Sequence, residues 1–394
     1  MSATARPPVA FVIQRYGAEI TGGSESLARA VAERLLDHYQ ITVFTTCAVD
    51  YVTWRNALPE GTHDVNGVEV RRFPSVSERD LDAFNVLSEP LYRGPRSHDD
   101  EIEWLRRQGP ETPALVDALS AEADRFHAIV FFTYLYYPTY WGLKAAPRRS
   151  VLVPTTHDEP PLRFSIYDEM FARPRAFAFL TGSEEALVRS RFEIGGRPAG
   201  VAGIGIDIPA TADSAGLRQR HSLHTPYALY AGRIDAGKGC AEMIAHYAAY
   251  HSGGGRADLV LIGALAMELP PVPGLRYLGF LSDEDKQAAM AGAHVVVCPS
   301  PYESLSIVLL EAFAAGVPGL VNARSAVLKD HCLRANGGLF YAGADEFAAA
   351  LDLIVTDDAL RRGMGRSGRR YVDVNYRWDA VLARYRALIE AAAG

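Results

Sequence analysis

Two glutamates, Glu303 and Glu311, have the residue type and spacing of a ligand-binding pair. They lie in the run CPSPYESLSIVLLEAFAAGVP, in which an apolar strand leads into a Pro-Ser loop and then into an apolar helix starting near Leu305. Glu303 would follow the carboxyl end of the strand, and Glu311 would lie about two turns into the helix, about 9 to 12 Å along its axis. Two such carboxylates can hold two sugar rings, and the helix N-terminus between them favours a diphosphate. The alternative is a capping glutamate and an exposed helical one, but the strand and loop place both residues at the ligand-binding end of a parallel sheet.

A glycine-rich turn, GRIDAGKG at residues 232–239, carries two cations, Arg233 and Lys238. The turn directly follows an apolar strand and precedes a helix. A guanidinium offers a planar fork to phosphate oxygens and an ammonium offers a compact charge. Together they can stabilise a departing diphosphate without a metal ion, so we expect neither a metal nor a cofactor. Two solvated surface cations are the alternative interpretation.

A second glycine loop, with Gly22 and Gly23 between Thr21 and Ser24, follows the first apolar run of the chain. Paired glycines let the backbone approach a ligand closely, and Ser24 is expected to cap the following helix. Helix N–H groups at that end favour an anion. A purely conformational role for the two glycines is the alternative.

His157 lies in the run THDEP, after the apolar segment 150–155, and so at the carboxyl end of an expected strand. An imidazole there could approach a bound sugar. A structural histidine whose hydrogen bonds are satisfied within the fold is the alternative.

With these motifs in place, nearly the whole chain resembles the retaining glycosyltransferases of family four, which have the GT-B architecture. Their signature is a glutamate, seven residues and a second glutamate in this context. The resemblance implies that Glu303 contacts hydroxyls of the transferred sugar and that Glu311 holds the ribose. It also implies that Arg233 and Lys238 bind the donor diphosphate.

The chain departs from the family pattern at two places. The family usually has Gly-Phe-Gly after the first glutamate, whereas Ser304, Leu305 and Ser306 stand here. Backbone N–H contacts to the diphosphate would survive only if neither serine needs a conformation restricted to glycine. Many members also carry a histidine after the preceding strand, where this chain reads FFTY at 131–134, and this leaves His157 as the candidate imidazole.

The order of apolar runs predicts an α/β protein with two Rossmann-like, doubly wound parallel sheets and an interdomain cleft. The first domain is expected over 1–208 and the second, nucleotide-sugar-binding domain over 209–377. A hinge is expected at 203–214, and a closing helix at 378–392, after an irregular stretch, is expected to pack back on the first domain. The charged segment 75–126, with one helix at 101–108, is interpreted as an insertion on the first domain. It serves either acceptor recognition or no role beyond that of a solvent-exposed helical segment. The expected strands are 9–14, 41–46, 128–133, 150–155, 177–181, 227–231, 258–262, 276–280, 294–298 and 319–322, and Ser282 and Asp285 are expected to form a capping box.

Composition excludes several other classes of protein. The 394 residues are 48% hydrophobic and 22% charged, as in globular proteins, with a formal net charge of −7. That charge argues against a nucleic-acid partner and against an anionic bilayer, since both need a clustered basic face. The four cysteines show no metal-ligand spacing, and the N-terminus is too short and mixed for a signal peptide, so we expect a cytoplasmic protein.

The expected activity is transfer of a sugar from a nucleotide diphosphate sugar, with UDP as the default carrier, to a small-molecule or glycan acceptor. A nucleotide-sugar 2-epimerase of the same fold is the main alternative. A dinucleotide-dependent oxidoreductase is disfavoured because no GxGxxG run follows the first strand. A two-domain solute-binding module is disfavoured because that class is normally exported and no signal peptide is recognised. The sequence leaves the sugar, the base, the acceptor and the oligomeric state open.

Overall fold

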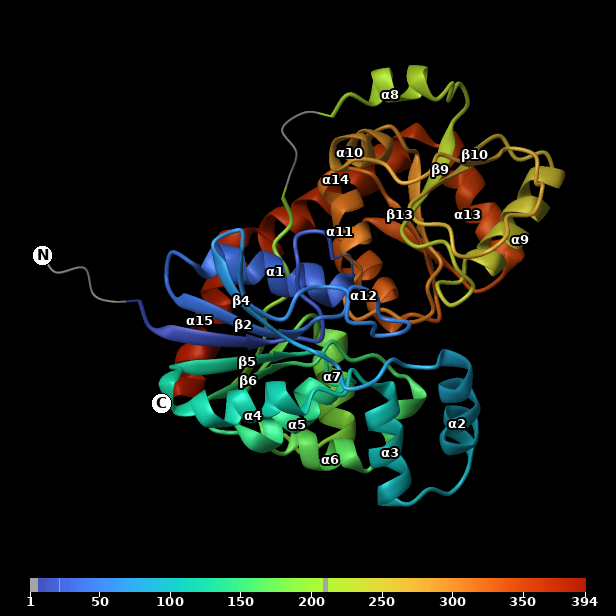
Figure 1. Cartoon of the computed structure of the whole chain (residues 1–394). Coiled ribbons are helices and arrows are strands. Elements are labelled where there is room, and N and C mark those ends of the chain that lie inside the picture. Colours follow the sequence, from blue (N-terminus) through green and yellow to red (C-terminus); the bar gives the residue numbers. More distant parts are fainter. Residues whose placement is uncertain (1–5, 21, 208–211) are drawn as a thin grey trace, which may run out of the picture. The chain divides into compact units, whose positions relative to one another are not determined.

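The computed structural model describes residues 6–20, 22–207 and 212–394, which form two compact units (Figure 1). Unit 1 comprises Met1–Ile204 and Val381–Gly394, and unit 2 comprises Gly205–Ala380. Compactness therefore divides the chain at 204 and 380, whereas the domain prediction uses 208 and 377. Residues 208–211 of the predicted hinge lie outside the described residues.

Unit 1 is built on an eight-stranded sheet with the order β3-β4-β2-β1-β5-β6-β7-β8. Neighbouring strands run parallel except β3 and β4. The loops after the parallel strands therefore meet at one edge of the sheet, its carboxyl edge. The strands are β1 (Pro8–Val12), β2 (Gln40–Thr46), β3 (Gly61–Val65), β4 (Val68–Phe73), β5 (Ala128–Phe132), β6 (Ser150–Val153), β7 (Ala176–Phe179) and β8 (Ala199–Val201).

The hairpin of β3 and β4 is absent from the sequence prediction. Its two-residue turn is Asn66-Gly67, and both residues have positive φ, 54° and 82°. An Asn-Gly pair is the strongest short signal for such a turn because both residues tolerate that conformation. The signal was present in the sequence, but β3 has no fully buried residue and so lacks the apolar run that marks the other strands.

The segment 75–126 contains three helices, so the prediction of a single helix at 101–108 was incomplete. These are α2 (Leu81–Arg93), α3 (His98–Gln108) and α4 (Pro113–Glu122). A capping box between Ser97 and Asp100 starts α3 three residues earlier than predicted. Leu115 and Leu119 of α4 are fully buried, so this part of the segment belongs to the core of unit 1.

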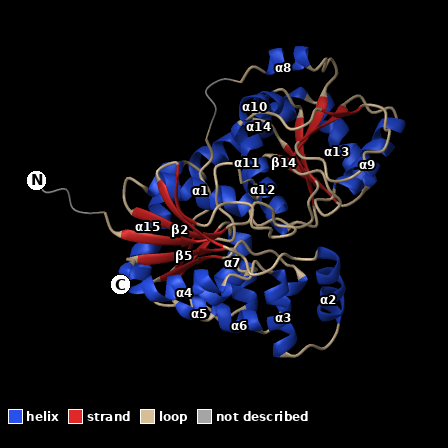
Figure 2. Ribbon diagram, in the orientation of Figure 1, coloured by secondary structure: helices blue, strands red, loops and turns tan. Residues whose placement is uncertain are grey.

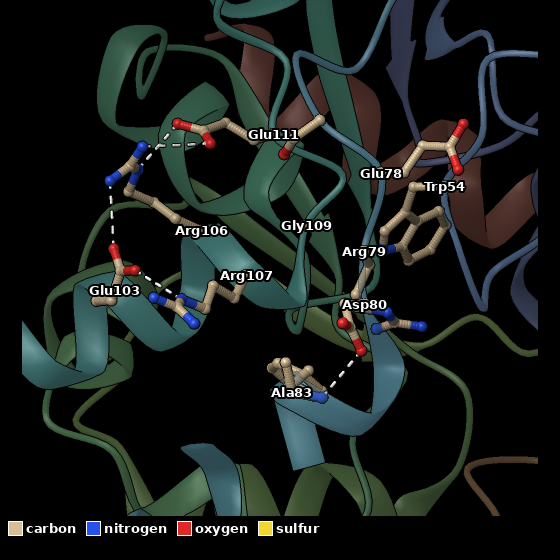
Figure 3. A pocket seen from close by; sticks show the side chains of 12 residues that line it. Trp54, Glu78, Arg79, Asp80, Ala83, Glu103, Arg106, Arg107, Gly109 and Glu111 are labelled. Carbon is tan, nitrogen blue, oxygen red and sulfur yellow. Dashed lines mark hydrogen bonds and ion pairs between the residues drawn. The ribbon is translucent and has the colours of Figure 1, made fainter. Parts of the chain in front are cut away.

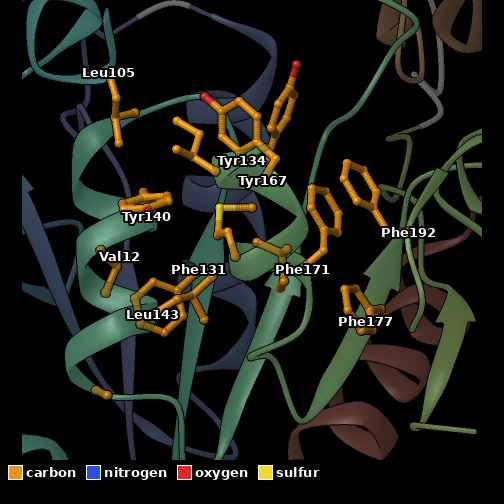
Figure 4. Close-up of a cluster of buried hydrophobic side chains, with 14 of the residues drawn as sticks. Val12, Leu105, Phe131, Tyr134, Tyr140, Leu143, Tyr167, Phe171, Phe177 and Phe192 are labelled. Carbon is orange, nitrogen blue, oxygen red and sulfur yellow. The ribbon is translucent and has the colours of Figure 1, made fainter. Parts of the chain in front are cut away.

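Helices lie on both faces of the sheet of unit 1, with α1 (Gly23–Leu35) on one side and α4 and α5 (Tyr137–Ala145) on the other (Figures 1 and 2). The remaining helices are α6 (Ile166–Phe171) and α7 (Gly182–Arg191), with 3-10 turns at Ala123–Arg125 and Pro160–Arg163. The core beneath α5 and α6 is aromatic (Figure 4). Phe131, Tyr134, Tyr167 and Phe171 are fully or almost fully buried there, which fixes the ends of β5 and the following loop.

Unit 2 is built on a six-stranded parallel sheet with the order β11-β10-β9-β12-β13-β14. The chain moves outward from β9 to β11, then returns to β12 beside β9 and moves outward in the other direction. Open sheets of this kind bind ligands where the order reverses, which here is between the carboxyl ends of β9 and β12. The strands are β9 (Tyr227–Ala231), β10 (Asp258–Ile262), β11 (Leu275–Tyr277), β12 (Val295–Cys298), β13 (Gly319–Asn322) and β14 (Gly338–Tyr341).

The helices of unit 2 differ from the prediction mainly near its end. The predicted irregular stretch before the closing helix is the 18-residue helix α14. Its glycines hid it from the sequence, yet Gly365 is needed because a Cβ there would lie 2.0 Å from the carbonyl oxygen of Gly316. The helices are α8 (Ser214–Arg220), α9 (Cys240–Ser252), α10 (Asp283–Ala291), α11 (Ile307–Ala314), α12 (Ala326–Ala335), α13 (Ala344–Thr356) and α14 (Asp358–Asn375).

The closing helix α15 (Trp378–Ala393) is bonded to unit 1. The Tyr385 hydroxyl donates to the carbonyl of Gly203 at 3.1 Å, and the Tyr39 hydroxyl donates to Glu390 at 2.7 Å. Among the described helices, none is long and apolar enough to cross a bilayer.

Candidate functional site

The carboxyl ends of β9 and β12 bring two of the sequence motifs together. Lys238, from the turn after β9, places its Nζ 3.0 Å from Oε1 of Glu303, in the loop after β12. The lysine side chain is 39% exposed and the glutamate side chain 20%, so the pair can be reached from solvent. This contact lies where the strand order reverses, which is where the fold favours a ligand.

Asp235 shapes the cationic turn after β9, although sequence reasoning did not single it out. One carboxylate oxygen accepts from the backbone N–H of Lys238 at 2.7 Å, and the other forms an ion pair with Nε of Arg233. Gly239 has a φ of 76°, and a Cβ there would lie 2.5 Å from the carbonyl oxygen of Pro299. A glycine is therefore required for this turn to approach the loop that carries Glu303.

Glu311 lies in the second turn of α11 and pairs with a lysine that the sequence analysis missed. Lys286 of α10 donates from Nζ to Oε1 of Glu311 at 2.7 Å. Oε2 of Glu311 is buried and has no hydrogen-bond partner among the described residues. No periodicity links these two positions in the sequence, since they lie on different helices.

The predicted capping box at Ser282 is also altered, because Asp285 accepts from Arg220 while Ser282 caps α10.

The three residues that replace Gly-Phe-Gly precede α11, which begins at Ile307 rather than near Leu305 as predicted. Ser306 is its N-cap residue and has φ 63° and ψ 77°, a left-handed conformation that favours glycine. Its side chain makes no capping hydrogen bond, so it leaves the first N–H groups of the helix uncapped. Ser304 is not among the positive-φ residues of the described chain, so only one of the two serines takes the glycine-like conformation.

Leu305 is 3% exposed and anchors this loop. Its carbonyl oxygen accepts from Nε2 of His331 at 2.9 Å, and Nδ1 of His331 lies 3.1 Å from the Tyr371 hydroxyl. Burial lowers the pKa of His331 to about 4, so the imidazole is neutral at physiological pH. The backbone that presents Ser304 and Ser306 is therefore held from beneath by a buried hydrogen-bond chain.

In unit 1, Gly22 and Gly23 stand at the start of α1, but the expected serine cap was wrong. Gly22 is the N-cap residue, and the Ser24 hydroxyl instead donates to Oε2 of Glu25 at 2.9 Å. The helix begins at Gly23, which puts Ser24 inside the first turn. Thr21 of this motif lies outside the described residues.

Glu25 and Arg15 form a buried ion pair beneath the glycine loop that the sequence analysis missed. Nη2 of Arg15 lies 2.6 Å from Oε1 of Glu25, and Gln14 also donates to that oxygen at 3.0 Å. A Cβ on Gly22 would lie 2.3 Å from Oε2 of Glu25, whereas a Cβ on Gly23 meets nothing within 4 Å. Gly22 is therefore needed for close packing on the glutamate.

His157 follows β6 and is held by a carboxylate. Its Nε2 lies 3.2 Å from Oε2 of Glu159, whose Oε1 accepts from the Tyr134 hydroxyl at 2.7 Å. Tyr134 is 1% exposed and occupies the stretch after β5 where the family often has a histidine. A Glu two residues after the His was visible in the sequence, but only the fold shows that Tyr134 reaches it.

Glu184 also holds the loop of His157. The carboxylate is 1% exposed and accepts from the backbone N–H groups of Thr156 and Leu180, both at 2.6 Å. Burial raises the pKa of Glu184 to about 7 in spite of these hydrogen bonds. The loop after β6 is thus fixed by a carboxyl group that titrates near neutral pH.

A cavity of about 300 Å³, here called the insertion pocket, opens in unit 1 (Figure 3). Its walls come from the loops after β2 and β4, the start of α2, and the end of α3 with the loop that follows it. Pockets for small molecules begin at about this volume. The lining residues are Trp54, Ser77, Glu78, Arg79, Asp80, Ala83, Phe84, Glu103, Arg106, Arg107, Gly109 and Glu111.

Parts of this chain are similar in sequence to known glycosyltransferases. Residues 217–371, most of unit 2, match the family model of group 1 glycosyl transferases. A phosphatidyl-myo-inositol mannosyltransferase of Mycolicibacterium smegmatis is 31% identical over 48% of this chain and 51% of its own length. The first three curated relatives are matched over 27% to 55% of their own length, so the chain spans about a quarter to a half of them.

Solved structures match over nearly the whole chain. Sucrose-phosphate synthase from Thermosynechococcus elongatus superposes with a TM-score of 0.72 at 19% identity, covering 98% of this chain and 100% of that one. An Anabaena protein solved in complex with UDP and glucose gives a TM-score of 0.68 at 15% identity, covering 97% and 99% of the two chains. With its two sheets of parallel type, the chain has the GT-B fold, which confirms the predicted fold class.

Proposed function

We propose that this protein is a retaining glycosyltransferase that moves a sugar from a UDP-linked donor to an acceptor hydroxyl without a metal ion. The observation that carries the proposal is the 3.0 Å contact between Lys238 and Glu303 at the reversal point of the unit 2 sheet. It joins a phosphate-binding cation to a sugar-binding carboxylate. The match of residues 217–371 to group 1 glycosyl transferases and the UDP complex of a structural neighbour support the proposal.

In this proposal the donor diphosphate is bound by Arg233 and Lys238 and by the N–H groups at the start of α11. Glu303 then accepts hydrogen bonds from hydroxyls of the transferred sugar. Glu311 holds the ribose through its carboxylate. These groups stabilise negative charge that develops on the leaving phosphate, which is the interaction with most effect on the rate.

Two groups of unit 1 complete the proposed set. Gly22 and Gly23 offer backbone N–H groups to the donor phosphate, because no side chain caps the start of α1 and such a helix end favours an anion. His157, oriented by Glu159, contacts the transferred sugar. The buried pair of Arg15 and Glu25 keeps the glycine loop in place.

The proposed reaction retains the anomeric configuration. The bond from the anomeric carbon to the diphosphate oxygen breaks, and the acceptor hydroxyl oxygen bonds to the same face through an oxocarbenium-like state. The acceptor proton passes to an oxygen of the departing phosphate. No protein group needs to act as the general base, so charge stabilisation by Arg233 and Lys238 is the main contribution of the chain.

The test is to incubate the purified protein with UDP-glucose, UDP-galactose or UDP-N-acetylglucosamine, each with and without a neutral acceptor such as D-glucose or myo-inositol, and with and without EDTA. We expect UDP release that survives EDTA and depends on an acceptor, and a product whose anomeric configuration by NMR equals that of the donor. Conversion of the donor into its 2-epimer without an acceptor would instead support the epimerase. Loss of activity in EDTA, or an inverted product, would contradict the proposal.

A further inference from the structure

The insertion pocket lies at the carboxyl edge of the unit 1 sheet, beside the proposed donor loop. Two of its walls follow β2 and β4, and β2 pairs directly with β1, which leads to Gly22. Adjacent strands are about 4.8 Å apart, so the two loops begin side by side. The loop after β2 also contacts Arg15, which lies beneath the glycine loop. The Arg15 guanidinium is 5.6 Å from the ring centre of Tyr51.

Two arginines of the pocket are already neutralised by its own carboxylates (Figure 3). Arg106 donates from Nε to Glu111 at 2.9 Å and from Nη1 to Glu103 at 3.2 Å. Arg107 donates from Nε to the other oxygen of Glu103 at 2.7 Å. A ligand therefore meets carboxylates and guanidinium groups that already pair with one another, rather than an unpaired cation.

The third arginine, Arg79, is committed to the backbone. It donates to the carbonyl oxygens of Val52 at 2.8 Å and Gln108 at 3.2 Å, and its guanidinium lies 5.1 Å from the ring centre of Trp54. Burial lowers the pKa of Arg79. Its N–H groups are used to join the loop after β2 to the end of α3.

Two more carboxylates line the pocket, Glu78 and Asp80. Asp80 caps α2 by accepting from the N–H of Ala83 at 3.0 Å, and neither carboxylate forms an ion pair within the described part of the chain. Four carboxylates thus face three guanidinium groups, all of which are engaged. A phosphate entering the pocket would be repelled by carboxylates without gaining an unoccupied cation.

We infer that the insertion pocket binds the acceptor and selects an uncharged polyhydroxylated molecule, such as a sugar or a cyclitol, over its phosphorylated form. A hydroxyl both donates and accepts, so it can bond to a carboxylate and to a guanidinium that are held side by side. This inference rests on the proposed function, which supplies the need for a hydroxyl acceptor. It separates this chain from enzymes whose acceptor carries a phosphate.

The test compares matched pairs of probes, D-glucose with D-glucose 6-phosphate and myo-inositol with myo-inositol 1-phosphate. Binding is measured by saturation-transfer NMR at millimolar concentration with UDP present, and transfer by UDP release from the donor that the protein consumes. We expect the neutral member of at least one pair to bind at least about tenfold more tightly than its phosphate. Tighter binding of a phosphorylated member, or no binding of any neutral probe, would overturn the inference.

Variants then place the binding in the pocket. Glu103→Gln should weaken binding of the neutral probe by about tenfold, because Arg106 and Arg107 lose the anion that orients them. Glu78→Lys, at an exposed position, should improve binding of the phosphorylated member by about fivefold. Glu89→Gln, which opens an exposed ion pair with Arg93 outside the pocket, is the control and should change neither value. Equal effects of Glu103→Gln and the control would overturn the inference.

The donor side distinguishes the two proposals. UDP binding by calorimetry should be unchanged in the Glu103 and Glu78 variants. If UDP binds and a donor is consumed but the neutral probes are not preferred, only the acceptor inference fails. If the neutral probes bind while no nucleotide sugar is consumed, the transferase proposal fails and the pocket remains a polyol site.

Discussion

The ammonium of Lys238 and the carboxylate of Glu303 lie 3.0 Å apart although 65 residues separate them in the chain. Because both side chains are partly exposed, their attraction adds little to stability. Its consequence is positional, since each charge holds the other at the point where the sheet order reverses. In the proposed function, the lysine would bind the diphosphate of a donor and the glutamate would bind its sugar.

Lys238→Ala should lower turnover far more than donor binding. The ammonium is expected to stabilise charge that forms only as the phosphate departs, so kcat should fall by about a hundredfold or more while the donor KM changes by less than about threefold. Steady-state kinetics with the consumed nucleotide sugar measure both values. Lys144→Ala on α5 is the control, and equal losses in kcat and donor binding would refute the role given to Lys238.

Lys286→Met should destabilise the protein because it leaves the Glu311 carboxylate without its partner. The glutamate side chain is only 15% exposed, so we expect the free energy of unfolding to fall by about 1 to 3 kcal/mol. Urea denaturation measures the change. Arg93→Met removes an exposed ion pair with Glu89 and should cost no more than about 1 kcal/mol. Similar losses of unfolding free energy in the two variants would show that the Lys286 contact stabilises the protein no more than an exposed ion pair does.

Ser306→Gly should leave stability unchanged or raise it by up to about 1 kcal/mol. The left-handed conformation of Ser306 costs about 1 to 2 kcal/mol in a residue with a Cβ, and the gain is offset by the greater freedom of glycine in the unfolded chain. Ser304→Gly lacks the compensating gain and should lower stability by about 0.5 to 1 kcal/mol. A thermal or urea scan in which Ser306→Gly is the less stable variant would contradict this account.

Gly22→Ala and Gly23→Ala should differ sharply although the positions are adjacent. The new methyl group of the first variant would lie 2.3 Å from the Glu25 carboxylate, so we expect a loss of about 1 to 3 kcal/mol. The second methyl group meets nothing within 4 Å and lies at a helical position, where alanine is favoured. Urea denaturation of both variants tests the packing, and equal stability would argue against it.

Glu184 should make stability fall as the pH rises towards neutrality. Its pKa is about 7 in the folded protein and about 4.3 in an unfolded chain, so the folded state binds more protons between these values. The stabilising contribution is therefore complete below about pH 4.3 and is lost as the pH rises through about 7, by about 4 kcal/mol in all.

The Glu184→Gln variant tests this dependence, because it cannot ionise at that position. Urea denaturation from pH 5 to pH 8 should give a shallower fall in stability for the variant than for the wild type. Glu185→Gln, which removes a partly exposed ion pair with Arg189 on the same helix, should keep the wild-type slope. Parallel slopes for all three proteins would remove the pH role of Glu184.

The sequence by itself determined the fold class and supplied the candidate residues of the proposed donor site in unit 2. Apolar runs that alternate with helices, each followed by a glycine or polar loop, specify parallel sheets with ligand loops at one edge. This is why Arg233, Lys238, Glu303 and Glu311 could be named from their positions after β9 and β12. Local signals of this kind can be recognised from the sequence because each motif is continuous in the chain.

Only the tertiary structure decided which side chains face one another. Lys286 beside Glu311, Tyr134 bonded to Glu159, and Arg15 buried on Glu25 come from separate elements, and no spacing rule relates them. The same holds for the insertion pocket, whose charge balance depends on how α2 and α3 are placed beside two loops. Such contacts arise from packing of distant segments, and that packing also makes Ser306 adopt a conformation that its own residue type disfavours.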